Sequence, residues 1–115
     1  MTDEALRDVV DVNALADELL ARAQDDPQRK ASHLIVHGEH QRAVLMALLA
    51  GSSLAEHSSP PAATLHVLRG RVRLSAGGDQ EWTVSTGQVV TVPPDRHAVD
   101  AVDDSVILLT VALKA

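Results

Sequence analysis

The side chains best suited to chemistry at neutral pH in this chain are its six histidines. An imidazole titrates close to neutrality and also binds transition metals, so each histidine is a candidate proton carrier or metal ligand. His57 and His97 stand out because glycines and prolines that are typical of loops lie close to each. His33, His37 and His40 form a second group. The chain has no cysteine, which excludes disulfides, thiolate catalysis and zinc bound by cysteine.

Composition narrows the classes of partner. Sixteen acidic against ten basic residues give a net charge of −6, so a nucleic-acid backbone would be repelled. No apolar run approaches the roughly 18 residues of a membrane span, and the N-terminal Met1-Thr2-Asp3-Glu4 is acidic where a secretion signal would be basic. We therefore expect a single cytoplasmic domain that binds neither nucleic acid nor membrane.

The N-terminal part of the chain has the pattern of an amphipathic helix. Between Asp11 and Gln24, apolar residues recur three or four positions apart, with charged residues on the other faces. Asp11 or Asn13 is a suitable N-cap, and Asp25-Asp26-Pro27 ends the helix. We assign residues 1–31 to a helical segment and residues 32–115 to a β domain.

Beyond Lys30 the pattern changes from helical to extended, with short apolar runs separated by turn sequences. In the first run, Leu34 and Val36 are expected to be buried, which leaves His33 and His37 together on an exposed face. Short strands at regular spacing are typical of an all-β barrel or jelly roll. Strands are expected at residues 32–37, 42–50 and 64–69, around 72–74 and 82–84, and at residues 89–92, 97–102 and 106–113.

The stretch around His57 resembles the first motif of the cupin family, Gly-x5-His-x-His-x3-4-Glu-x6-Gly. Gly51, His57 and Gly70 stand at the matching places of this motif. Ser59 replaces the second histidine, and Ala63 replaces the glutamate.

The stretch around His97 resembles the second cupin motif, Gly-x5-Pro-x-Gly-x2-His-x3-Asn, less closely. Gly87 and Pro93 keep their spacing, and His97 stands one residue early. Asp95 takes the place of the second glycine, and Ala101 replaces the asparagine.

The resemblance covers about residues 32–113 and implies a cupin-type jelly-roll β-barrel, here with an N-terminal α-helix. In cupins with the full pattern, three histidines and a glutamate hold Fe, Mn, Ni or Zn inside the barrel. Only His57 and His97 keep such places here, with His40 as a third candidate just past a predicted turn. Catalytic metal sites normally have at least three protein ligands, so the implied site is incomplete.

Three roles are open for such a chain. The ligand set favours a small-molecule binding or sensing module, in which the two histidines orient a ligand or transfer a proton. A metal-dependent enzyme of the dioxygenase or isomerase type would complete the site with a further ligand, and a purely structural dimer would have a packed interior. The residues expected to contact a ligand in the first role are His57, His97, Leu65, Val67, Val72, Leu74 and Trp82.

The outer surface of the predicted barrel favours self-association. Leu68 is expected on the outer sheet face beside His66, and the apolar run Val106–Leu113 cannot leave both of its faces in water. One helix covers only part of a sheet, and a large exposed apolar patch generally marks an interface. We therefore expect a homodimer.

Overall fold

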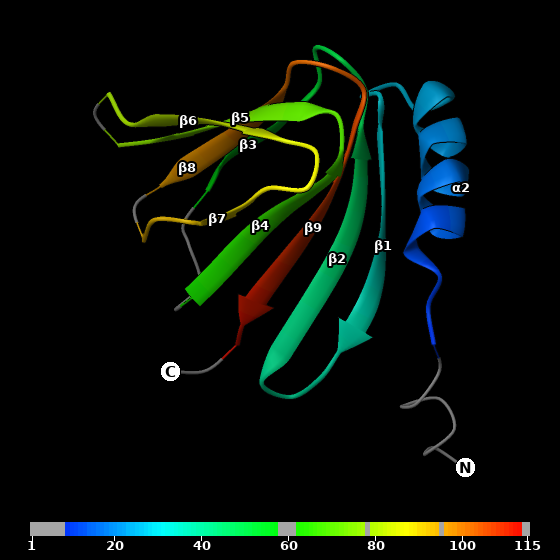
Figure 1. Cartoon of the computed structure of the whole chain (residues 1–115), viewed down its shortest axis with the longest axis horizontal. Helices are drawn as coiled ribbons and strands as arrows, with labels where there is room; N and C mark the ends of the chain where they lie inside the picture. The colour runs from blue at the N-terminus through cyan, green and yellow to red at the C-terminus, as the bar shows by residue number, and fades with distance from the viewer. Residues whose placement is uncertain (1–8, 58–61, 78, 95, 114–115) are drawn as a thin grey trace.

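The computed structural model describes residues 9–54, 62–77, 79–94 and 96–113, together with the backbone of residues 55–57 (Figure 1). Within these residues one helix precedes nine strands, which confirms the mostly-β expectation with an N-terminal helix. The elements are α2 (Val12–Gln24), β1 (Lys30–His37), β2 (Gln41–Leu48), β3 (Ser53–His57), β4 (Ala62–Arg69), β5 (Arg71–Ala76), β6 (Glu81–Ser85), β7 (Val89–Thr91), β8 (His97–Ala101) and β9 (Ser105–Ala112).

The strands form two antiparallel sheets that face each other. One sheet has the order β1-β2-β9-β4-β7 and the other has the order β3-β8-β5-β6. Among the described residues, no strand pairing joins the two sheets into a closed barrel. Strand β9 therefore lies in the middle of the larger sheet, between β2 and β4 (Figure 1).

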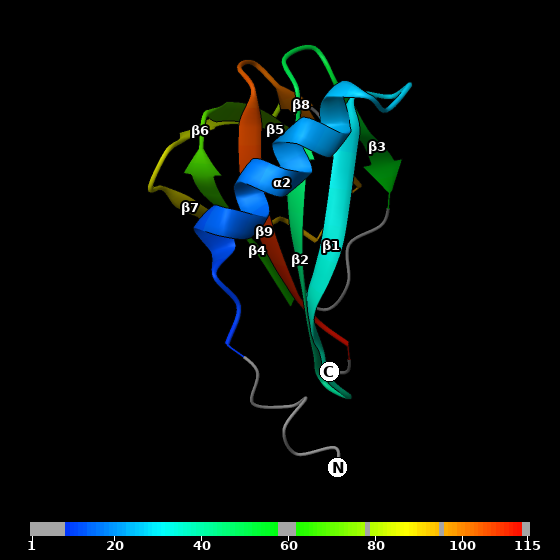
Figure 2. The ribbon, with the colours of Figure 1, turned by 90° about the vertical axis from the view of Figure 1, so that its right-hand side faces the viewer.

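Helix α2 lies across the outer face of the five-stranded sheet, over β1 and β2 (Figure 2). Asp11 is its N-cap, because the carboxylate oxygen accepts hydrogen bonds from the backbone N–H groups of Asn13 and Ala14 at 3.0 and 3.1 Å. The buried face of the helix packs against Leu45 and Val106, both fully buried. No helix in the described ranges is both long and apolar enough to cross a membrane.

The space between the two sheets is filled by small aliphatic side chains. Strands β4 and β5 contribute alternate residues, as the period of two requires. The inward parity changes from odd to even numbers between these strands, where Gly70 has a φ of +90° and the β4–β9 register shifts between Val67 and Arg69. The buried members are Leu48, Ala63, Leu65, Val67, Val72, Leu74, Val84, Val92, Val99, Ala101 and Ile107.

Strand β1 departs from the sequence expectation. Leu34 and Val36 are 40% and 38% exposed, whereas Ile35 packs into the cluster beneath the helix. Ile35 has the parity of His33, whose partner Leu45 lies beneath the helix, so ordinary alternation turns Ile35 toward the helix and Leu34 to the opposite face of this edge strand. A register irregularity between Leu34 and Val36 then changes the faces of Val36 and His37. It also separates His33 from His37: their partners on β2 are Leu45 and Arg42, three residues apart and so on opposite faces. Both histidines are exposed, as expected, but they do not share a face.

Candidate functional site

The two histidines singled out by the sequence are brought together by strand pairing. His57 ends β3 and His97 begins β8, and the two residues are partners in the antiparallel register. Directly opposed residues of an antiparallel pair share one face, so the backbone places both on the same face. His97 is buried, and it alternates with Val99 and Ala101 of the interior cluster. The side chain of His57, like the whole of Ser59, lies outside the described residues.

Four of the residues expected to contact a ligand are core residues. Leu65, Val67, Val72 and Leu74 are at most 1% exposed and belong to one packed cluster. None of them lines any of the three cavities described below. The inward orientation expected from the sequence is therefore confirmed, and contact with a ligand stays a prediction.

Trp82 lies at the rim of the interior instead of inside it. It is directly opposite Leu74 in the register, yet it is 36% exposed while Leu74 is fully buried. Strand β6 is an edge strand, and a cleft of about 380 Å³ separates it from β7. Val84 and Val90 also line this cleft, so it reaches the edge of the core. A third cavity, of about 170 Å³, lies between β1 and β3 beside Lys30.

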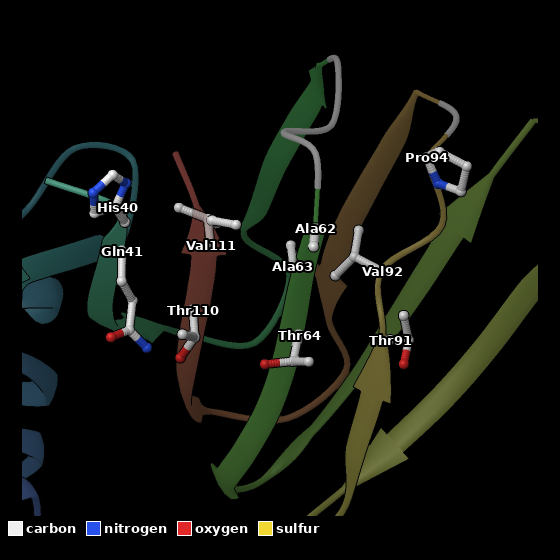
Figure 3. A pocket seen from close by; sticks show the side chains of 11 residues that line it. His40, Gln41, Ala62, Ala63, Thr64, Thr91, Val92, Pro94, Thr110 and Val111 are labelled. Atoms are coloured by element: carbon white, nitrogen blue, oxygen red, sulfur yellow. The ribbon is translucent and has the colours of Figure 1, made fainter. Parts of the chain in front are cut away.

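The largest of the three cavities is an open groove of about 600 Å³ on the five-stranded sheet (Figure 3). It spans the ends of β2, β9, β4 and β7, at positions that helix α2 does not cover. His40, the third candidate metal ligand, lies at one margin, and Pro94 lies at the other. The other lining residues are Gln41, Ala62, Ala63, Thr64, Thr91, Val92, Thr110, Val111 and Ala112.

A row of threonines crosses this groove. Thr64 on β4 pairs with Thr110 on β9 and with Thr91 on β7, so the three residues stand side by side on three adjacent strands. The row lies on the outer face because Thr64 has the parity opposite to that of the buried Leu65. Figure 3 shows these three side chains and Gln41 arranged across the four strands. Among the described residues, none of the three hydroxyls makes a hydrogen bond.

The threonine row had no signal in the sequence. Thr64, Thr91 and Thr110 are far apart along the chain and belong to no motif, and only the register brings them together. The parity of Thr64 relative to Leu65 was the single available hint of an outer-face position.

Comparison with known families gives a direct result. A family model described as a cupin domain matches residues 44–112 of the chain. The chain belongs to the cupin family. Among curated proteins, no sequence matches it significantly.

Solved structures with a similar fold include other small cupins. An RmlC-like cupin protein from Desulfovibrio desulfuricans is 30% identical, over 76% of this chain and 85% of that one, with a TM-score of 0.68. A conserved protein of unknown function from Streptococcus pyogenes is 22% identical, over 95% and 89%, with a TM-score of 0.71. A protein from Thermus thermophilus, TT1209, is 20% identical, over 93% and 98%, with a TM-score of 0.71. The last two likenesses show the fold alone.

The described residues of this cupin do not fit a complete metal centre. Ala63, at the place of the motif glutamate, is buried in the interior cluster and has no ligand atom. His40 is exposed and lines the outer groove, which His97 does not. Within the ranges that the structure describes, no three histidine, aspartate or glutamate side chains gather as a metal site would require.

Proposed function

We propose that this cupin is a small-molecule binding or sensing module whose ligand occupies the groove on the outer face of the five-stranded sheet. The observation that carries the proposal is the groove itself. Its volume of about 600 Å³ lies within the roughly 300–1,000 Å³ of ligand pockets. Alanine, valine and proline form much of its lining, and a few polar groups converge on it, which is the usual composition of such a site.

The proposal includes a cupin-type jelly-roll barrel for the domain. The four-stranded sheet β3-β8-β5-β6 and the run β2-β9-β4-β7 of the larger sheet supply eight strands in two facing sheets, as a jelly roll requires. Strand β1 then extends one edge of the larger sheet. Among the described residues, Leu65, Val67, Val72 and Leu74 pack between the sheets, and none of them lines the groove.

A ligand screen by NMR tests the groove. Backbone amide spectra recorded with a chemically diverse set of small molecules should show shifts confined to Thr64, Thr91, Thr110 and their neighbours. Ala62→Leu places a larger side chain at an exposed position of the groove and should abolish the shifts. Thr83→Leu, on exposed β6 outside the groove, is the matched control and should leave them intact. The proposal fails if no compound shifts these residues at millimolar concentration, or if Ala62→Leu binds as the wild type does.

A metal-dependent enzyme is the second candidate function, and the register of His57 with His97 favours it. In that case a third ligand from outside the described residues would complete the site, and the described chain would supply only His97 and the backbone position of His57. Metal analysis of protein purified without an affinity tag discriminates between the two functions. Near-stoichiometric transition metal that is lost in both His57→Ala and His97→Ala would support the enzyme.

A further inference from the structure

The three groove threonines form a regular array of hydrogen-bonding groups. Neighbouring strands of a sheet lie about 4.8 Å apart, so the side chains of Thr110, Thr64 and Thr91 repeat at about that interval across the groove. Each hydroxyl both donates and accepts, and the Gln41 amide at the end of the row does the same. Because the hydroxyls have no partner among the described residues, they are free to bond a ligand. Hydroxyl groups on alternate carbons of a polyol or a sugar ring have a comparable separation.

The described lining of the groove has one ionisable side chain, His40 at its margin. Among the described lining residues there is no aspartate, glutamate, lysine or arginine, whereas the whole chain carries a net charge of −6. An anionic ligand would find no lysine or arginine among the described lining residues and would be repelled by the protein as a whole. A cationic ligand would find no carboxylate. The lining therefore matches an uncharged molecule whose polar groups act both as donors and as acceptors.

From these two observations we infer that the ligand of the groove is a neutral, hydroxyl-rich small molecule of the polyol or sugar class. The hydroxyls of the ligand bond the threonine row and Gln41, and its C–H surface lies against Ala62, Ala112 and Pro94. The described lining of the groove has no tryptophan, tyrosine or phenylalanine for stacking, so the hydroxyl bonds provide most of the selectivity. This inference rests on the function proposed above and names the chemical class of its ligand.

Threonine methyl NMR tests the inference at the site itself. Protein labelled with ¹³C at its threonine methyl groups is titrated with sorbitol and glucose as neutral probes. The charged probes are glucuronate and glucosamine, and phenol is the apolar probe. Sorbitol or glucose should shift the methyl signals of Thr64, Thr91 and Thr110, and leave those of Thr83 and Thr86 in place. The charged analogues should bind less tightly, and the affinity for the neutral probes should not change between low and high salt, because no ion pair forms.

Threonine-to-valine substitutions then separate the effect of the hydroxyl groups on binding from the effect of side-chain shape. Thr64→Val and Thr110→Val keep the branched side chain and remove the hydroxyl, so each should weaken neutral-probe binding by about threefold or more, and the double variant by more than either. Thr83→Val removes a hydroxyl of exposed β6 and should change nothing. Unchanged affinity in Thr64→Val and Thr110→Val would overturn the inference.

The probes also distinguish this inference from the function on which it rests. If glucuronate, glucosamine or phenol shifts the groove methyl groups and the neutral probes do not, the groove binds small molecules but the inferred ligand class is wrong. If none of the probes shifts these signals, the ligand class is wrong, and the broader screen described above decides the function separately.

Discussion

Gly70, between β4 and β5, is packed so closely against Ser105 of β9 that a β-carbon on it would overlap the serine hydroxyl. The same β-carbon would meet the carbonyl oxygen of Asp104 and would stand 2.8 Å from the Cα atom of Ser105. Gly70 also has a φ of +90°, a conformation that favours glycine. Gly51 has nearly the same φ, +88°, but a β-carbon there would meet nothing within 4 Å. The two glycines therefore share a backbone conformation, but only at Gly70 would an added β-carbon clash with neighbouring atoms.

Substitutions of Gly51 and Gly70 allow the cost of a positive φ to be measured separately from the cost of a steric clash. Gly51→Ala should destabilise the protein by about 1 kcal/mol, the usual cost of alanine at positive φ. Gly70→Ala carries the same cost and also forces the β4–β5 bend away from β9, which should add at least about 1 kcal/mol. Gly70→Val should lower the free energy of unfolding by more than about 1 kcal/mol for the same reasons. Urea denaturation of each variant measures the difference, and equal losses in the two alanine variants would contradict the close packing at Gly70.

The hydroxyl of Ser105 has a structural role that can be tested separately. It is fully buried, accepts a hydrogen bond from the backbone N–H of Arg71 at 3.0 Å, and donates one to the carbonyl of Asp103 at 2.8 Å. Ser105→Ala leaves both backbone groups without this partner and should cost about 1–3 kcal/mol in the free energy of unfolding. Ser32→Ala, at an exposed position of β1, is the control and should stay within about 0.5 kcal/mol of the wild type. A neutral Ser105→Ala would mean that water replaces the hydroxyl.

Leu74 and Trp82 are partners across β5 and β6, but they should contribute differently to the stability of the fold. Leu74 is fully buried, so Leu74→Ala should cost about 2–5 kcal/mol, as expected for a core cavity. Trp82 is 36% exposed beside an open cleft, and Trp82→Ala should cost less than Leu74→Ala. Because Trp82 is the one tryptophan and the chain has no tyrosine, its emission reports this position alone. Acrylamide should quench that emission readily. Resistance to quenching would place the ring inside the core.

The predicted homodimer can be tested by the mass of the protein in solution. Leu68, expected on a free outer face, packs against the cluster beneath helix α2. Leu68→Asp should therefore lower stability, and it cannot serve as a probe of association. Light scattering at micromolar concentration should still give twice the chain mass of 12.2 kDa. A mass near that of one chain would show that the prediction of a homodimer is wrong.

The order of elements could be predicted because local patterns determine it. The helix at Asp11–Gln24, the turn residues and the period-two burial of β4 and β5 depend on neighbouring residues, and the structure agrees with each. Strand β3 was not expected as a separate strand, because its short sequence lies inside the motif stretch. The exposure of Leu34 was missed because a single strand does not encode which of its faces packs beneath the helix. The face of Val36 was missed because a register irregularity follows from pairing with β2.

The candidate site was predicted less completely, for a physical reason. Motif spacing identified His57 and His97, and the structure pairs their strands at these two residues. The groove depends instead on which strands become neighbours, since β4, β7 and β9 are distant in sequence and supply its threonine row. Trp82 was expected in the interior from alternation alone, but on the edge strand β6 it is 36% exposed.

The central position of β9 has a consequence for synthesis of the chain. Strand β9 pairs with both β2 and β4, and its Val106 lies under α2, yet the ribosome makes it after every other described element. Until β9 is available, β2 and β4 each carry one unpaired edge. Such edges favour aggregation, and contacts between distant segments form slowly. The five-stranded sheet should therefore become continuous only when β9 pairs with both β2 and β4.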